Sequence, residues 1–388
     1  MTERSLIFPA QEYRARIARL QAGMAAQGLE ALLLTTPADV FYTTGFLTRF
    51  WESPARPWFM VVPRKGDPVA VIPSIGAELM GRTWVRTIRT WDAPDTRDDG
   101  VSLLVDTLTA LVPERAGIGV PMGLETHLRM PLADFDALCR RLAPRALVDA
   151  TACIQRVREV KSEAEIAKIR TTCAIAARAF SRMPEFARAG RSLADVFRDF
   201  QIALLAEGAD WVSYVAGGAG PDGYGDVISP AGPQVLKRGD VLMLDTGTVS
   251  DGYFCDFDRN VAIGPASDSA RRAYCALWQA TEEVMDSLRP GLRACDLHRM
   301  LCDGLHRHGV TPVGGRLGHG LGVTLTEWPS FTPLDDTPLR AGMVLTLEPG
   351  CVVRDGVIMV HEENIVLRTT GAELLSPRAC ADLPEIDL

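Results

Sequence analysis

Two acidic residues in the middle of this chain lie where they could share a buried cation. Asp245 and Asp256 each end an apolar run short enough to be a buried strand, and a turn signal at Asp251-Gly252 separates the runs. A hairpin of this kind would bring both carboxylates to one place. Two buried anions repel each other and lose hydration, so a positive charge is expected between them. The alternative is that both acids end their strands in water.

A second stretch repeats this pattern about a hundred residues later. Residues 341–350 echo residues 238–247, with a glycine, an apolar strand, an acid (Glu348) and a turn of small residues. A further turn and an apolar run then lead to Glu362 and Glu363. Because side chains alternate along a strand, only one of these two glutamates can face the same way as the other acids.

A histidine between the two stretches completes the group. His319 has a glycine on each side, and glycine lets other groups approach the backbone closely. A single histidine is more often a packed core residue, but these neighbours leave it little packing of its own. Four carboxylates and one imidazole form a ligand set that suits a pair of first-row divalent cations such as Mn, Fe, Co or Zn.

The order of these residues resembles that of the pita-bread metallohydrolases, which include methionine aminopeptidase, Xaa-Pro aminopeptidase, prolidase and the metal-free creatinase. The phrases Gly-His-Gly-Leu-Gly and Leu-Glu-Pro-Gly carry the resemblance, most clearly over residues 155–375. It implies two divalent cations, with Mn favoured, and it selects Glu362 over Glu363. It also implies that Glu348 is the general base. The implied metal ligands are Asp245, Asp256, His319, Glu348 and Glu362.

The chain departs from this family at two histidines. Thr326 stands where the Xaa-Pro peptidases have a histidine, seven residues after the metal-binding one. Those peptidases have a second histidine before the first aspartate ligand, and residues 226–230, the corresponding part of this chain, contain none. Those histidines resemble donors that hold the substrate and the oxyanion in the peptidases. Their absence argues against ordinary dipeptide or Xaa-Pro cleavage. Thr326 and His361 are therefore candidate catalytic residues, and His361 is a candidate replacement donor.

Aromatic residues flank the predicted ligands. Trp211, Tyr214 and Trp328 are candidate substrate-binding residues, although such residues more often belong to a core. An aromatic cage would bind a quaternary or sulfonium cation. The phrase Glu327-Trp328-Pro329 resembles the dimethylsulfoniopropionate lyase branch of the superfamily, but that branch has an aspartate where this chain has Gly247.

Two residues of the first domain are candidates for a role across a dimer. In creatinase-like homodimers the first domain of one chain helps to close the site of the other. This resemblance makes Arg49 and Trp51 candidates for binding a substrate carboxylate.

Composition restricts the partners and the compartment. The chain of 388 residues is 47% hydrophobic and carries a formal charge of −8, which argues against nucleic acid as a ligand. No apolar run is long enough to cross a membrane. Nine cysteines without CxxC spacing predict reduced thiols and a cytoplasmic location.

Hydrophobic patterns predict two domains, a smaller α/β domain over residues 1–155 and a larger one over residues 156–388. The resemblance implies that the chain is an α+β protein and that its second domain has the pita-bread fold. The predicted elements of the first domain are a helix ending at Gly28, a strand at 31–34, a hairpin over 59–73, strands at 85–90, 116–120 and 146–149, and helices near 101–112 and 131–142.

The second domain is predicted to repeat a helix–helix–hairpin unit. Ser162 with Glu165 forms a capping box, and Ser192 with Asp195 forms a similar cap, so each pair predicts the start of a helix. Helices also fit 267–288 and 293–308.

These residues together predict a cytoplasmic, dinuclear metal-dependent hydrolase that cuts a C–N bond in a small molecule or short peptide and resembles the Xaa-Pro peptidases. The alternatives are an amidohydrolase similar to creatinase or ectoine hydrolase, a sulfonium lyase, and a catalytically silent binding protein. Five retained ligands argue against the last of these.

Overall fold

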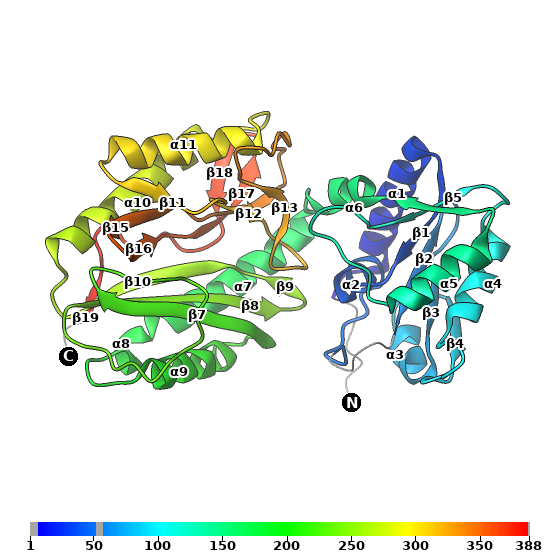
Figure 1. The fold of residues 1–388 in the computed structure, drawn as a ribbon, viewed down its shortest axis with the longest axis horizontal. Helices are drawn as coiled ribbons and strands as arrows, with labels where there is room; N and C mark the ends of the chain where they lie inside the picture. Colours follow the sequence, from blue (N-terminus) through cyan, green and yellow to red (C-terminus); the bar gives the residue numbers. More distant parts are fainter. Residues whose placement is uncertain (1–6, 52–56, 387–388) are drawn as a thin grey trace. The chain divides into compact units, whose positions relative to one another are not determined.

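The structure is a computed structural model that describes residues 7–51 and 57–386. Its chain divides into two compact units, Met1–Arg158 and Glu159–Leu388. The first unit ends with helix α6 (Thr151–Arg158), so the predicted domain boundary at 155/156 lies inside this helix. Figure 1 shows the helices and strands of both units.

The first unit is built on one mixed sheet with the strand order β4-β3-β2-β1-β5-β6. The pairs β1–β2 and β2–β3 are antiparallel, and the remaining pairs are parallel. Its strands are β1 (Leu29–Leu34), β2 (Phe59–Pro63), β3 (Val69–Pro73), β4 (Thr87–Trp91), β5 (Gly117–Val120) and β6 (Ala146–Asp149).

Helices pack against this sheet and bury its apolar residues. Helix α1 ends at Gly28, whose φ of 68° lies in the left-handed region that favours glycine, as the sequence predicts. Buried leucines and valines of α4 and α5 form one core with the strands. The helices, besides α6, are α1 (Ala10–Gln27), α2 (Pro37–Thr44), the 3₁₀ turn η1 (Ser74–Gly76), α3 (Ala77–Gly81), α4 (Val101–Leu111) and α5 (Leu132–Leu142).

The helices of the second unit begin where the capping residues predict. The capping box of Ser162 and Glu165 is present, and the Ser192 hydroxyl accepts a hydrogen bond from the Asp195 N–H. Both predicted caps are confirmed. The helices are α7 (Glu163–Ser181), α8 (Met183–Phe186), α9 (Leu193–Ala206), α10 (Asp268–Ser287) and α11 (Ala294–Arg307).

Three sheets complete the second unit. Their strand orders are β19-β10-β8-β7 with β9 paired to β8, then β13-β12-β14-β17-β18, and β11-β15-β16. The strands are β7 (Trp211–Pro221), β8 (Asp240–Ser250), β9 (Tyr253–Phe254), β10 (Phe257–Ile263), β11 (Thr311–Val313), β12 (His319–Gly320), β13 (Glu327–Ser330), β14 (Val344–Leu347), β15 (Gly350–Arg354), β16 (Val357–Val360), β17 (Glu363–Arg368), β18 (Gly371–Leu374) and β19 (Glu385–Ile386).

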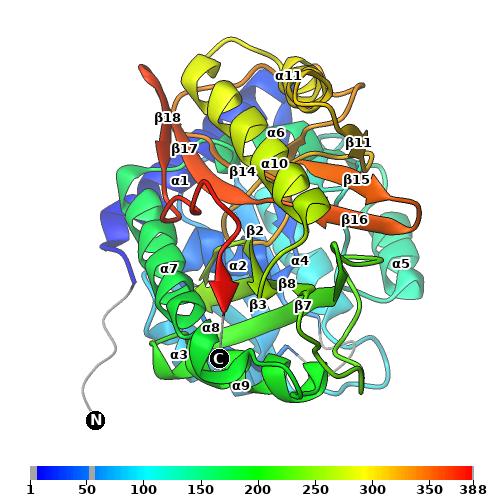
Figure 2. The ribbon, with the colours of Figure 1, turned by 90° about the vertical axis from the view of Figure 1, so that its left-hand side faces the viewer.

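The second unit is doubled, as its sequence predicts. Helices α7 to α9 precede strands β7 to β10, and helices α10 and α11 precede strands β11 to β18. Figures 1 and 2 show α7 to α9 on one side of the strands and α10 and α11 on the opposite side. The two sets of strands lie between these helix layers, and each set carries one of the echoed acidic stretches.

Strand β7 was not predicted, although it spans Trp211–Pro221. It contains three glycines, which have low intrinsic preference for strands, so local sequence gives a weak signal there. Pairing with β8 over most of its length supplies the order that the sequence alone does not indicate.

All nine cysteines lie in the described residues and are free thiols. Within the described ranges, no helix is both long and apolar enough to cross a membrane.

Candidate metal centre

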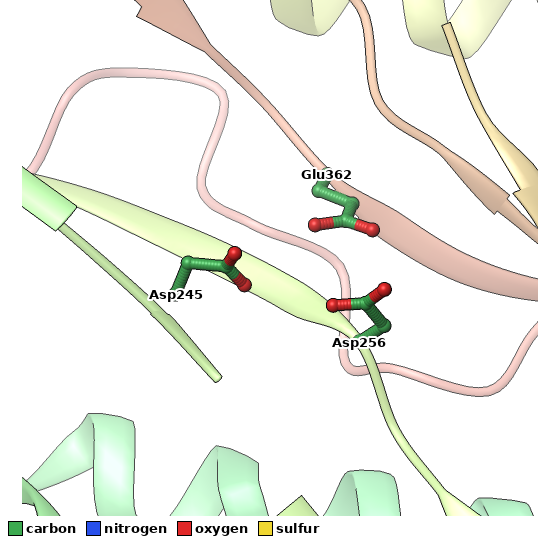
Figure 3. A group of neighbouring side chains, drawn as sticks. All are labelled: Asp245, Asp256 and Glu362. Atoms are coloured by element: carbon green, nitrogen blue, oxygen red, sulfur yellow. The ribbon is translucent and has the colours of Figure 1, made fainter. Parts of the chain in front are cut away.

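Three carboxylates from separate strand segments converge in the second unit. Asp245 lies within β8, Asp256 lies between β9 and β10, and Glu362 lies between β16 and β17. One oxygen from each residue lies within 4.8 Å of the others. Figure 3 shows the three carboxyl groups turned toward one another. The two predicted acidic stretches therefore meet, and Glu362 rather than Glu363 joins this group.

His319 and Glu348 extend the same group. The Nε2 atom of His319 lies 3.4 Å from Asp256 Oδ2 and 3.9 Å from Glu348 Oε1. Its other ring nitrogen, Nδ1, lies 2.8 Å from the carbonyl oxygen of Gly320. A proton on Nδ1 makes that hydrogen bond, which leaves the lone pair of Nε2 facing the carboxylates. This is the arrangement of histidines that bind metals. All five predicted ligand side chains therefore lie in one connected cluster.

The glycines beside His319 allow its strand to pass between two neighbours. Gly318 has a φ of 141°, and a Cβ atom there would clash with the carbonyl oxygen of Thr346 and the ring of Phe331. A Cβ atom at Gly320 would clash with the carbonyl of Trp328. The predicted close approach at these glycines is confirmed, and it holds β12 between β13 and β14.

Two carboxylates of the cluster are not fully satisfied by the residues that the structure describes. Among the described residues, the buried oxygens Asp245 Oδ1 and Glu362 Oε1 have no hydrogen-bond partner. Burial, together with the neighbouring carboxylates, raises the pKa of Asp245 and of Glu362 well above the ordinary range. Burial lowers the pKa of His319, but contact with Asp256 and Glu348 outweighs it and the net shift is upward. Converging buried anions with unused oxygens fit divalent cations, which would supply the missing positive charge.

Tyr214 contacts two of the predicted ligands. Its hydroxyl donates to Asp256 Oδ1 at 2.5 Å and lies 3.0 Å from Asp245 Oδ2. Burial and the surrounding carboxylates raise the pKa of Tyr214 well above its ordinary value, so the hydroxyl keeps its proton. The structure places this hydroxyl on two of the predicted ligand carboxylates, and the substrate-binding role that the sequence predicts for Tyr214 stays a prediction.

The two predicted catalytic donors lie in other contacts. His361 is buried, its Nε2 lies 2.7 Å from Arg378 Nη1, and its ring packs edge-on against Tyr274. Burial lowers the pKa of His361 to about 3, so the ring is neutral and its Nε2 accepts from the arginine. Thr326 is half-buried, and its carbonyl oxygen accepts from the Thr324 hydroxyl. Neither contact supports a donor role, which for both residues stays a prediction.

The remaining predicted substrate residues lie on both units. Trp211 begins β7 and packs edge-on against Phe254, and Trp328 lies on β13. In the first unit Arg49 is exposed, and Trp51 packs against Phe46 and Trp58. Their contact with substrate stays a prediction.

Two charged residues near the cluster were not predicted. The Nε atom of Arg316 lies 3.5 Å from Glu348 Oε1, and 35% of its side chain is exposed. Asp258 is buried, and burial raises its pKa to about 7. Its position two residues after Asp256 was a usable signal, because alternation along an extended segment places both side chains on one side. Arg316 had a weaker signal, as a cation three residues before His319.

The chain matches two family models. Residues 167–370 match metallopeptidase family M24, and residues 16–160 match the creatinase/prolidase N-terminal domain. The probable dipeptidase PepE of Mycobacterium tuberculosis (strain ATCC 25618 / H37Rv) is 30% identical over 380 residues, which cover 95% of this chain and 97% of that protein. The Xaa-Pro dipeptidase of Pyrococcus horikoshii is 26% identical over 263 residues, or 66% of this chain and 72% of that protein.

Solved structures share the whole fold. The crystal structure of dipeptidase PepE from Mycobacterium ulcerans has a TM-score of 0.84 at 28% identity and covers 98% of this chain and 100% of that chain. The recombinant prolidase from Thermococcus sibiricus has a TM-score of 0.85 at 23% identity, and the match covers 96% of this chain and 99% of that chain. The second likeness shows the fold alone. Together these matches confirm the expected pita-bread α+β fold.

Proposed function

The chain belongs to metallopeptidase family M24 and is a metal-dependent hydrolase, and on this premise we propose that it hydrolyses the peptide bond of a short peptide. The observation that carries the proposal is the convergence of five ligand-type side chains, with unused buried oxygens, in the second unit. The printed names of the relatives, dipeptidase and Xaa-Pro dipeptidase, favour a peptide over creatine, ectoine or a sulfonium compound.

In this proposal the cluster holds two divalent cations. Carboxylate oxygens outnumber the single imidazole, and we propose Mn as the cation because such hard ligands suit it. A bound pair of cations supplies Lewis acidity, which polarises a substrate carbonyl and makes water more acidic. The proposed ligands are Asp245, Asp256, His319, Glu348 and Glu362.

Glu348 is proposed as the general base. Its side chain is 24% exposed, whereas those of His319 and Asp256 are 2% and 6% exposed. Glu348 therefore borders the accessible side of the cluster, where an attacking water would enter. Its carboxylate can accept a proton from that water and later return it to the leaving amine.

Arg316 is proposed to bind the carboxylate of the substrate peptide. Its guanidinium lies beside Glu348, so it borders the same accessible side, and it is partly exposed. A guanidinium can bind a carboxylate through two parallel hydrogen bonds. Arg49 and Trp51 keep their proposed role at a site closed by a second copy of the chain, which makes the enzyme a homodimer. Nine free cysteines favour a reducing compartment, and we propose the cytoplasm.

The test combines metal analysis with a substrate panel. We expect the purified protein to hold about two Mn ions per chain, to lose activity on chelation and to regain it on Mn addition. The panel contains dipeptides with and without a second-position proline, together with creatine, ectoine and dimethylsulfoniopropionate. Turnover of a dipeptide supports the proposal. Turnover of a non-peptide compound alone, or dipeptide turnover that survives complete metal removal, refutes it.

A further inference from the structure

A side chain from the opposite sheet holds the main chain of Asp256. The N–H of Asp256 donates to Asn364 Oδ1 at 3.0 Å, and Asn364 Nδ2 donates to the carbonyl oxygen of Asp256. One asparagine therefore satisfies both main-chain polar groups of a proposed metal ligand. Asn364 is fully buried, so water does not compete for these hydrogen bonds.

The reverse contact is made by the residues that follow Asp256. The N–H of Glu362 donates to Asp258 Oδ1 at 3.1 Å, and Arg259 Nη1 donates to the carbonyl oxygen of Glu362 at 3.0 Å. Asp258 lies two residues after one ligand, and Asn364 lies two residues after the other. We call these two reciprocal contacts the cross-brace, formed by the side chains of Asp258, Arg259 and Asn364 on the main chains of Asp256 and Glu362.

The cross-brace joins strands that no sheet connects. Strand β10 pairs with β8 and β19, whereas β17 pairs with β14 and β18. Among the residues that the structure describes, β10 and β17 share no ladder of main-chain hydrogen bonds. The separation between Asp256 and Glu362 therefore depends on side-chain contacts across the junction of the two sheets.

The asparagine of the cross-brace is itself fixed. Its N–H donates to Ser376 Oγ at 3.1 Å, and its carbonyl oxygen accepts from the Leu375 N–H at 2.8 Å. Cys173 Sγ also lies 3.4 Å from Asn364 Oδ1. Asn364 has little freedom to move, because hydrogen bonds hold both its main chain and its side-chain amide. It can therefore impose a position on Asp256 rather than follow it.

We propose that Asn364 and Asp258 are positioning residues, which hold Asp256 and Glu362 at a fixed separation across two sheets and so preform the metal site. The inference rests on the proposed metal centre. Buried carboxylates repel one another until a cation binds, and the cross-brace keeps them together in its absence. Cation binding then requires little rearrangement, which raises the affinity.

Metal binding to purified, metal-free protein tests the cross-brace. Asn364→Leu removes both contacts to Asp256, and we expect its Mn dissociation constants to rise about 10- to 100-fold, the usual effect of losing a contact that orients a ligand. Asn260→Leu is the matched control. Asn260, on β10, is buried like Asn364. Its side chain contacts the carbonyl oxygen of Val360 and the hydroxyl of Tyr224 instead of the main chain of a proposed ligand. The control variant should lose thermal stability and keep its Mn affinity.

A second pair of variants separates positioning from direct binding. Asp258→Asn keeps an acceptor for the Glu362 N–H, so its Mn affinity should stay within about threefold of the parent protein. Asp258→Leu removes the acceptor and should bind as weakly as Asn364→Leu. Equal losses in Asp258→Asn and Asp258→Leu would overturn the inference, because the Asp258 charge would then be what matters. This pair also keeps the test valid if Asn364→Leu does not fold.

The spacing of the two cations gives a readout that general destabilisation would not change. Two Mn ions at fixed separation give an exchange-coupled electron paramagnetic resonance spectrum, which we expect to broaden or disappear in Asn364→Leu and to persist in Asn260→Leu. Unchanged affinity and an unchanged spectrum in Asn364→Leu would refute the cross-brace alone. Absence of Mn binding by the parent protein would instead refute the proposed Mn centre on which the inference rests.

Discussion

Glu362 and Glu363 are neighbours in sequence, and their carboxylates lie in opposite surroundings. Glu362 faces Asp245 and Asp256, and one of its buried oxygens has no partner in the described chain. Glu363 faces two arginines, with Oε2 at 3.1 Å from Arg259 Nη2 and Oε1 at 3.0 Å from Arg378 Nη1. Burial alone would raise the pKa of Glu363, but the charge of Arg259 and hydrogen bonds from Ser376 and the Ala379 N–H lower it overall.

The different surroundings of Glu362 and Glu363 indicate different roles for these two buried acids. The chain supplies the counterions of Glu363, so this residue stabilises the fold. The described residues supply none for Glu362, whose charge a cation from solution would balance in the proposed site. The same comparison resolves the choice between the two glutamates, because strand alternation sends them to opposite faces and only Glu362 meets the other acids.

The largest effect is expected from Glu362→Gln. We expect the variant to lose about 10³-fold in kcat/KM, or ~4 kcal/mol of transition-state stabilisation, because a proposed metal ligand is lost. Its metal-free form should unfold at the same or a higher urea concentration, since a repulsive buried charge is removed. Metal analysis, kinetics and urea unfolding check this. Full metal occupancy with near-normal turnover would contradict the assignment of Glu362.

Glu363→Gln should show the opposite pattern. Removing this charge leaves Arg259 and Arg378 without their buried partner, so we expect the free energy of unfolding to fall by about 3 kcal/mol. The loss should be similar with and without Mn, because Glu363 does not face the cluster. Urea unfolding in both conditions measures it. A loss seen only with Mn present would show that Glu363 acts through the metal.

The pH dependence of the metal-free protein gives a third test. Folding raises the pKa values of Asp245, Glu362 and Asp258, that of Asp258 to about 7. Between the ordinary pKa near 4 and the raised values, the folded state binds more protons than the unfolded state. Stability should therefore increase as pH falls, by roughly 2 kcal/mol between pH 8 and pH 5, although His361, whose pKa burial lowers to about 3, opposes this gain below its ordinary value of 6.5.

Glu363 limits this gain at lower pH. Because its pKa is lowered, its contribution is lost as pH falls through that value, so the gain should end and reverse in more acidic buffer. Urea unfolding with chelator across this range measures the curve. A metal-free protein that loses stability steadily from pH 8 to pH 5 would show that the cluster carries no excess negative charge.

The smallest effect is expected at Arg316, which is 35% exposed, whereas Arg259 and Arg378 are 16% and 17% exposed. Arg316→Met should raise KM about tenfold, or ~1.4 kcal/mol, for peptides with a free carboxylate. Peptides with an amidated end should be unaffected by the change, and they serve as the control. Equal losses for both kinds of peptide would assign Arg316 to positioning Glu348 instead.

Local sequence signals predicted most of the fold. The capping serines Ser162 and Ser192, the terminating Gly28 and the periodic apolar residues are short-range features, and their helices begin or end as expected. Strand β7 is different, because its glycine-rich sequence becomes a strand only through pairing with β8. Its omission also hid the contact of Tyr214 with the acids, since that tyrosine reaches them from β7.

The sequence predicts those site residues that belong to a repeated sequence pattern. The echo between the stretches ending at Asp245 and Glu348 indicated which acids converge, and the family order selected Glu362. The surroundings of His361 could not be predicted, because its partner Arg378 lies in the last segment of the second unit and no local pattern joins them. Asn364 was missed for the same reason, since its role depends on a sheet junction.

The glycines around His319 restrict how this enzyme could be redesigned. Gly318 and Gly320 are enclosed by backbone carbonyls of adjacent strands, so a library that randomises them should return glycine almost alone. Variation that alters the range of accepted molecules has to come from residues such as Arg316 and Thr326, which are at least partly accessible. An engineer would therefore remodel the entrance and leave the histidine strand as it is.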